Sequence, residues 1–353
     1  MRPRYPHTMN RDRPARPGRP ERRAHRSGAG APPLLPLLFL AAALSGLPVD
    51  SAAQSPAPEA GTTSLPLLSI GFGARGAALG EALTAWPGGA DAVYWNPAAS
   101  VPLPEGGSRV DLAGGELFGD VRQSSASWSV GWGRAGLTLH LLYSGVGDIP
   151  VRGALPTPEP LGTTSAYDLA GGVSAALPLP SGGSAGVTVR GLYEKLDVFD
   201  AAGAALDAGV LLPLPVWGER LQVGLSVRNL GSVGRLETEK LELPWSRALG
   251  VAFARPVAVA GWRVLAGADI WKPRGDWSQL RAGLEARKEL LSLRTGLRVG
   301  EGWRTLSAGI GLDLGSWELD YAYVYDEDPD RRFLGNLQRV GLRVHLGSGD
   351  GYR

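Results

Sequence analysis

The stretch LSLRTGLRV, residues 291–299, contains the pattern that decides the fold. Its residues alternate between apolar and polar, as they do along a β-strand whose two faces meet different surroundings. The apolar positions are uncharged, whereas two of the polar positions hold arginine. The apolar residues are Leu291, Leu293, Leu297 and Val299, and the polar residues are Ser292, Arg294, Gly296 and Arg298.

The same alternation recurs from about residue 108 to residue 346, in about 14 segments, an even number as in bacterial outer-membrane barrels. We therefore predict an all-β fold, a transmembrane antiparallel β-barrel of about 14 strands. The segments are 108–117, 121–132, 134–143, 164–177, 183–194, 204–213, 221–228, 245–255, 260–271, 277–287, 291–299, 303–313, 315–325 and 339–346.

Three features favour a membrane barrel over a soluble β-sandwich or propeller, in which strands also alternate. The polar positions are rich in Arg, Gly, Ser and Asp, as suits a wet lumen, and the apolar positions are almost uncharged, as suits lipid. Short connections, such as 132–134 and 287–290, alternate imperfectly with long ones, such as 144–163 and 230–244. Nine of the 11 tryptophans lie in the strand region, most of them near strand ends, where interfacial aromatic belts lie.

Residues 1–53 have the layout of a basic leader and secretory signal peptide. Nine arginines within residues 1–30 precede the apolar run LLPLLFLAAALSGL at 34–47, which is too short for a membrane-spanning helix. Cleavage after Ala53 leaves 27 basic and 31 acidic residues, a net charge of −4, so nucleic-acid binding loses its support. The absence of Cys excludes a Cys-linked lipid anchor, disulfides and Cys-based metal sites.

Residues 65–105 lack the alternation and include DAVYWNPAAS at 91–100. A short helix is expected over 74–86, and Asn96 followed by Pro97 predicts a helical turn capped by the asparagine. This segment has too little apolar surface to fold alone, but its small residues permit close packing inside the barrel. We predict a linker and lumenal hatch at 54–107, the barrel at 108–346 and a C-terminal tail at 347–353.

The hatch sequence SIGFGARGAALGEALTAWPGGADAVYWNPAAS, residues 69–100, resembles the N-terminal signature of the PorV/PorQ family, which belongs with FadL-type outer-membrane transport barrels. The resemblance extends over nearly the whole chain after the signal peptide. It departs from the family at Ala99, where glycine is frequent, and at the C-terminus, which lacks a final aromatic residue. The matching residues are Arg75, Ala78, Gly80, Ala82, Asp91, Trp95, Asn96, Pro97 and Ala98.

In this hatch, Asp91 is expected to meet lumenal arginines, while Tyr94 and Trp95 wedge the hatch against the barrel wall. Charged residues in the polar phase of the strands are expected to face the lumen, where they pair with one another or attract an anionic solute. These lumen-facing candidates are Arg190, Arg228, Arg294, Arg298, Arg343, Asp207, Asp269, Asp313 and Asp320.

Catalytic chemistry is not indicated. His140 and His345 also fall in the polar phase, but neither has the local Ser or Asp arrangement of a triad. The segment DEDPD at 326–330 lacks the regular spacing of a calcium loop, so we do not expect a metal site there. We do not expect a cofactor either.

The resemblance implies a non-catalytic outer-membrane component of type IX protein secretion, which docks or delivers secreted proteins. Its partners are then membrane lipids, secreted cargo or subunits of the secretion machinery, without nucleic acid. The alternative is a FadL-like channel for hydrophobic small molecules, and a third possibility is a soluble all-β binding protein. An apolar tunnel that leads to an opening in the wall favours the channel, whereas a wide cavity with no apolar ligand site favours protein docking.

Overall fold

A computed structural model describes residues 63–86, 90–100, 107–117, 120–154, 158–180, 182–214, 221–236, 239–240, 242–253, 257–327 and 336–346. The predicted leader, signal peptide and C-terminal tail lie outside these residues, as does most of the DEDPD segment. None of the helices among the described residues has the length and apolar character needed to cross a membrane.

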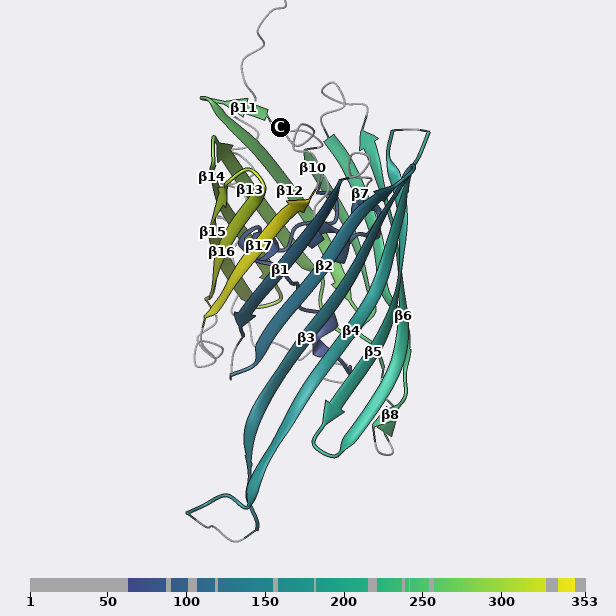
Figure 1. Ribbon diagram of the computed structural model, residues 1–353, viewed down its shortest axis with the longest axis vertical. Helices are drawn as coiled ribbons and strands as arrows, with labels where there is room; N and C mark the ends of the chain where they lie inside the picture. The colour runs from purple at the N-terminus through teal and green to yellow at the C-terminus, as the bar shows by residue number, and fades with distance from the viewer. Residues whose placement is uncertain are drawn as a thin grey trace, which may run out of the picture.

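Alternating segments form long strands that pair with their neighbours in sequence, always antiparallel (Figure 1). The first seven strands of the wall are β1 (Ser108–Glu116), β2 (Arg122–Trp132), β3 (Ala135–Val151), β4 (Gly162–Pro178), β5 (Ser184–Leu196), β6 (Phe199–Leu214) and β7 (Leu221–Val233). Those that follow are β10 (Ser246–Phe253), β11 (Val257–Val259), β12 (Trp262–Pro273), β13 (Gln279–Lys288), β14 (Leu291–Gly300), β15 (Trp303–Asp313), β16 (Trp317–Asp326) and β17 (Leu337–Leu346).

The sheet closes on itself, because β1 pairs with β17 and β10 pairs with both β7 and β12. The strands β10 and β11 pair with β12 one after the other along its length, so together they count as one strand of the wall. The predicted antiparallel barrel of 14 strands is therefore confirmed. A separate two-stranded ladder, β8 (Arg235–Leu236) with β9 (Glu239–Lys240), lies between β7 and β10.

The two ends of the barrel differ. At the turn end, β2 and β3 are joined through residues 133–134, and β13 and β14 through residues 289–290. At the opposite loop end, β3 and β4 run on as a ladder to Val151 and Gly162, through a β-bulge between Val146 and Ile149. The strands predicted at 134–143 and 164–177 are both longer in the structure, because backbone pairing continues after the apolar alternation has stopped.

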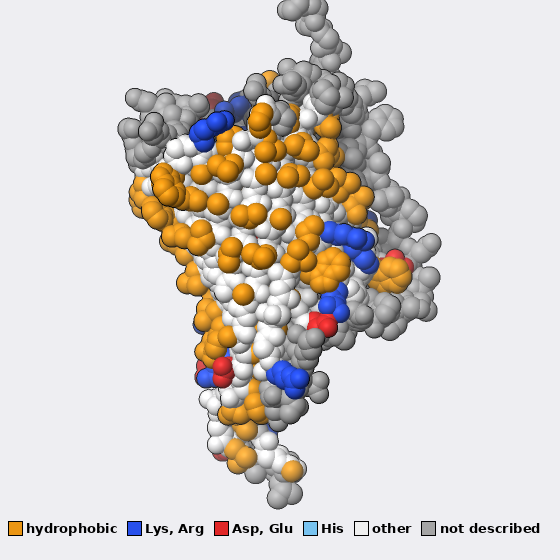
Figure 2. All heavy atoms as spheres, turned by 90° about the vertical axis from the view of Figure 1, so that its right-hand side faces the viewer, with side chains coloured by type: hydrophobic (Ala, Val, Ile, Leu, Met, Phe, Trp, Pro, Cys, Tyr) orange, Lys and Arg blue, Asp and Glu red, His pale blue; other side chains and the backbone are white. Residues whose placement is uncertain are grey.

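The outer face of the wall is apolar, and Figure 2 shows its apolar side chains as a band with charged side chains mostly near its margins. Outward residues such as Leu139, Val189 and Val340 are 45%, 58% and 59% exposed. Outward aromatic side chains lie near both ends of the strands. At the turn end these are Trp128, Trp132 and Trp317, and at the loop end Tyr143, Tyr167 and Tyr193 lie in a row. A closed wall with an apolar outer face and aromatic margins is the architecture that spans a membrane.

Candidate functional site

The hatch (63–86 and 90–100) occupies the lumen and runs along it from one end to the other (Figure 1). At the loop end, the Ser64 amide donates to the Glu242 carbonyl at 3.0 Å. Towards the turn end, the Ser184 hydroxyl of β5 donates to the Ala98 carbonyl at 2.7 Å. Four short helices lie between these anchors: η1 (Pro66–Leu68), α2 (Ala74–Ala78), α3 (Ala90–Trp95) and η2 (Pro97–Ala99).

The helix α2 is shorter than the sequence predicts. It ends before Gly80 and Glu81, which have φ values of +61° and +59°. A Cβ on Gly80 would lie 2.7 Å from the Leu297 amide nitrogen and 2.8 Å from the Ala282 carbonyl oxygen. Only glycine allows this approach to β13 and β14 at a positive φ, so contact with the wall ends the helix.

Inward glycines on the strands let the hatch backbone approach the wall. A Cβ at Gly224 would lie 2.1 Å from the Thr84 carbonyl oxygen, and a Cβ at Gly296 would lie 2.0 Å from the Gly80 amide nitrogen. The glycines that meet the hatch in this way, with a Cβ within 2.6 Å of a hatch atom, are Gly186, Gly209, Gly224, Gly283, Gly296 and Gly309. The alternation places glycine in the polar phase, but it does not say which of these glycines the hatch contacts.

Tyr94 and Trp95 stack with arginines of the wall. The Arg281 guanidinium lies 4.6 Å from the Trp95 ring centroid, and that of Arg228 lies 4.4 Å from it on another strand. Arg228 also lies 5.0 Å from the ring of Tyr94, whose hydroxyl donates to the Leu68 carbonyl at 2.9 Å. Cation–π contacts of buried arginines are worth about 2 kcal/mol each.

The stack continues beyond the hatch on both sides. Arg281 lies 4.1 Å from the ring of Trp271 on β12, and Arg190 lies 5.7 Å from the ring of Tyr94. Trp95 is 1% exposed and Tyr94 is 8% exposed, so the two rings are held inside a column of alternating aromatic and guanidinium groups.

Asn96 fixes the turn that follows. Its side-chain oxygen Oδ1 accepts from the Ala98 amide at 3.0 Å, as the predicted cap requires, and Pro97 is the first residue of η2. Its amide group donates to the Thr84 carbonyl at 2.7 Å and to the Val210 carbonyl of β6 at 3.2 Å. One fully buried side chain thus joins two parts of the hatch to the wall.

Asp91 is placed differently from the prediction. Among the described residues it forms no ion pair, and its carboxylate accepts from the Gly76 amide of α2 at 3.1 Å. Burial raises the pKa of Asp91, although Arg343 and Arg75 oppose that shift. The carboxylate therefore joins α3 to α2 within the hatch.

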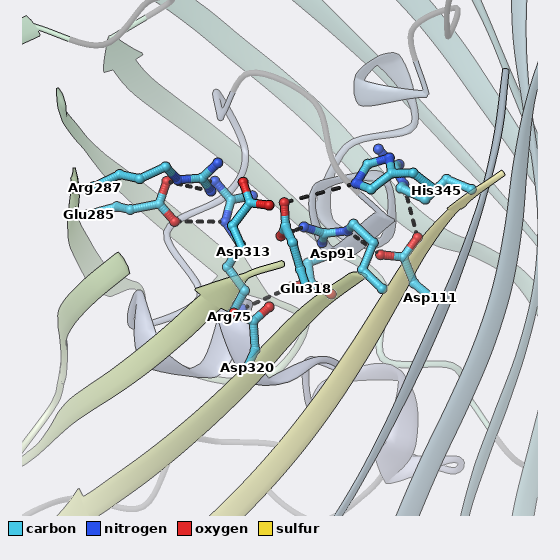
Figure 3. A network of polar contacts seen from close by, with 12 residues as sticks. Arg75, Asp91, Asp111, Glu285, Arg287, Asp313, Glu318, Asp320 and His345 are labelled. Atoms are coloured by element: carbon cyan, nitrogen blue, oxygen red, sulfur yellow. Dashed lines mark hydrogen bonds and ion pairs between the residues drawn. The ribbon is translucent and has the colours of Figure 1, made fainter. Parts of the chain in front are cut away.

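An ion-pair network joins α2 to the wall (Figure 3). Arg75 binds Glu285 of β13 through two contacts, at 2.9 and 3.1 Å. Glu285 also accepts from Arg294 at 2.7 Å, and Arg294 pairs with Asp320 at 2.5 Å. Because Arg75, Glu285 and Arg294 are buried and every member is paired, the network fixes the position of α2 over β13, β14 and β16.

A second cluster surrounds Glu81 of the hatch. Its carboxylate lies 3.0 Å from Arg298, 3.5 Å from Arg281 and 4.0 Å from Arg339, and it also accepts from the Gly71 amide at 3.1 Å. One carboxylate thus lies among three arginines.

The remaining lumenal candidates lie as follows. Arg190 pairs with Asp207 at 2.7 Å, and Arg343 pairs with Asp111 and Glu318 at 2.6 and 2.5 Å. Asp269 accepts from the Thr84 amide at 2.8 Å instead of from an arginine. Asp313 lies at the end of β15, where it accepts from the Gly315 amide at 3.0 Å.

Sequence reasoning did not single out Glu81, Asp111, Arg281, Glu285, Glu318 or Arg339. The five wall residues among them occupy the inward phase of their strands, so the alternation contained the signal. Glu81 belongs to the hatch and had no such pattern. Among the described residues, no three His, Asp or Glu side chains gather in a way that would hold a metal ion.

Side chains of the described residues line a small cavity and a larger vestibule beside the hatch. A small cavity of about 50 Å³ lies between the hatch and the inner faces of β1, β2 and β3. Its lining includes the apolar side chains of Phe72, Val93, Tyr94 and Leu142, next to His140. A larger, polar vestibule of about 300 Å³ lies at the loop end, beside Trp271, Arg281, Arg298 and Trp303.

A membrane-type barrel closed by a lumenal hatch is the class of protein that this geometry defines. Among solved structures, the Pseudomonas putida toluene transporter TodX has the same fold, with a TM-score of 0.58 and 13% identity over 80% of this chain and 97% of TodX. The monoaromatic hydrocarbon channel CymD gives a TM-score of 0.53 and 12% identity over 78% of this chain and 97% of that chain. No protein-family model and no curated protein matches the sequence. This chain thus has the barrel fold of TodX and CymD, and at 12–13% identity the likeness shows the fold alone.

Proposed function

We propose that the protein is a non-catalytic outer-membrane channel for hydrophobic small molecules, exported through the signal peptide at residues 1–53. The observation that carries the proposal is the hatch-closed 14-strand barrel, whose fold is that of TodX, a toluene transporter. The loop end faces outward in this assignment, because long connections of outer-membrane barrels are external.

The spaces around the hatch support a channel over a protein-docking barrel. The cavity beside β1–β3 is partly lined by aromatic and aliphatic side chains, as ligand pockets are, with Asp111 and Arg343 at its edge. Its volume of about 50 Å³ is below the roughly 300 Å³ of a usual ligand pocket, so a ligand fits only after the hatch has shifted. The hatch side chains Phe72, Val93 and Tyr94 form part of that lining, so a shift of the hatch changes the size of the cavity. A solute then passes from the vestibule to the cavity when the hatch moves.

This proposal is tested by measuring uptake while a disulfide holds the hatch to the wall and again after the disulfide is reduced. A Cβ at Gly341 of β17 would lie 3.5 Å from the Ala74 Cβ of α2, within the range of a disulfide. Since the chain has no cysteine, Ala74→Cys with Gly341→Cys introduces one pair only. We expect uptake of labelled toluene or a long-chain fatty acid to fall on oxidation and to return with reductant.

The two single-cysteine variants are the controls, and their uptake should not respond to oxidation. Uptake by the unmodified protein that does not exceed that of a strain without it would contradict the channel.

The second candidate is a PorV/PorQ-type component of type IX secretion, which docks or delivers secreted proteins. The hatch motif from Arg75 to Ala98 favours it. In that case a deletion strain loses proteins from its secreted and surface proteome while its hydrocarbon uptake is unchanged. An unchanged secreted proteome would exclude this candidate.

A further inference from the structure

Two basic side chains face each other on the outer surface of the wall. Arg247 of β10 lies directly opposite Lys272 of β12 in the antiparallel register. They alternate with the inward residues Ser246 and Trp271, which are 1% and 4% exposed. They therefore share the outward face with Leu249 and Ile270, and both lie at the loop end of their strands.

Like charges directly opposite each other on an antiparallel pair are destabilising. Among the described residues, neither Arg247 nor Lys272 has a carboxylate within ion-pair distance. The Lys272 ammonium donates to the Asp276 backbone carbonyl, and the Asp276 carboxylate accepts from the Trp277 amide at 2.7 Å. The positive charge of the pair is therefore not neutralised by this part of the chain.

Another outward arginine at the loop end shows the contrast. Arg122, the first residue of β2, lies directly opposite Glu116 of β1. Its cross-strand neighbour is thus an acid, whereas the neighbour of Arg247 is a second base. The pair at Arg247 and Lys272 is the arrangement that an external anion would stabilise.

The surface next to this pair is shaped for an apolar chain. A shallow groove of about 810 Å³ runs over β5, β6, β7, β10 and β12 beside Arg247 and Lys272. Small residues, Ala185 and Ala208, leave room in it, and Leu225, Leu249 and Ile270 supply apolar contact. Trp277, 44% exposed, lies in the adjoining connection, as interfacial tryptophans do.

We propose that Arg247 and Lys272 bind the phosphate of a lipid A-type glycolipid in the outer leaflet, with an acyl chain in the adjoining groove. Phosphate carries more than one negative charge near neutral pH and accepts charge-assisted hydrogen bonds from both side chains. The inference rests on the outer-membrane placement of the proposed function, but it does not depend on what the channel carries.

Thermal unfolding of the purified full chain in neutral detergent tests the proposal. Bisphosphorylated lipid A should raise the midpoint of the unmodified protein and dephosphorylated lipid A should raise it less. In Arg247→Gln with Lys272→Gln, the apparent affinity for bisphosphorylated lipid A should fall by about tenfold or more. Arg122→Gln is the matched control and should retain the affinity of the unmodified protein.

The stability of the double variant without lipid distinguishes a lipid-binding site from a pair of side chains that stabilises the fold. In detergent alone, the double variant should be as stable as the unmodified protein or more stable, because it removes a like-charge contact. Equal binding of dephosphorylated lipid A, or unchanged affinity in the double variant, would overturn the proposal. Equal stabilisation by phosphatidylglycerol would overturn the choice of glycolipid. A missing uptake activity would leave all these readouts unaffected, so the two proposals fail separately.

Discussion

At the scale of single residues, the adjacent aromatics Tyr94 and Trp95 are explained by arginines that lie far away in sequence. Trp95 is held between Arg228 and Arg281, which come from β7 and β13. Two arginines side by side in a lumen repel each other, and an aromatic ring between them offers each guanidinium its π face. The wedge predicted from the motif is thus more specific than a simple apolar contact.

Gly80 gives the sharpest prediction at this scale. In Gly80→Ala, the added methyl group meets the backbone of Leu297 and Ala282, which cannot turn aside as a side chain can. We expect the hatch to become sensitive to protease, with a cost well above the roughly 1 kcal/mol of placing alanine at a positive φ.

The control is Gly133→Ala in the turn between β2 and β3. Gly133 has a similar φ of +58°, but nothing lies within 4 Å of the added Cβ. Equal protease sensitivity in the two variants would show that backbone strain, and not contact with the wall, sets the requirement at Gly80.

At the scale of elements, the helix α2 is attached to the wall by an asymmetric ion-pair network. Glu285 holds both Arg75 and Arg294, whereas Arg294 has a second acid in Asp320. Glu285→Ala therefore leaves Arg75 buried without its ion-pair partner and should cost about 3–5 kcal/mol. In Arg75→Ala, Glu285 keeps Arg294, and the cost should be smaller, about 1–3 kcal/mol.

Limited proteolysis of the hatch at increasing urea concentration measures both variants. Glu285→Ala should expose the hatch at a lower urea concentration than Arg75→Ala, while heat-modifiable migration shows that the barrel still assembles. The reverse order would contradict the network as the attachment of α2.

At the scale of the whole molecule, closure of the lumen should depend on pH through Glu81. Burial alone raises its pKa, but Arg298, Arg281 and Arg339, with the Gly71 amide, hold the pKa of Glu81 below the ordinary 4.5. A lowered pKa in the folded state means that the stabilisation is present above the ordinary value and is lost as the pH falls through the folded one. We expect bilayer conductance to rise below about pH 4.5 as the hatch loosens.

Asp91 contributes with the opposite sign. Burial raises its pKa, so protonation of Asp91 favours the closed hatch as the pH falls. In Glu81→Gln the rise of conductance in acid should therefore shrink, while the opposing effect of Asp91 remains. Acid-induced conductance that persists unchanged in Glu81→Gln would refute the assignment.

Much of the architecture was predictable, because strand alternation is a local property of the chain. The strands, their number and the inward direction of residues such as Arg190, Arg294 and Asp320 follow from period-two alternation, which every barrel strand must show. The ladder of β3 and β4 beyond residues 143 and 164 was not predictable, because it depends on backbone pairing and not on side-chain polarity.

The sequence by itself determined a membrane-type barrel of 14 strands and a hatch that differs from it in pattern. Only the tertiary structure decided that Trp95 lies between Arg228 and Arg281, that Glu81 faces three arginines, and that Arg247 lies opposite Lys272. The physical reason is that these contacts depend on barrel closure and strand register, which bring together residues that no local pattern relates.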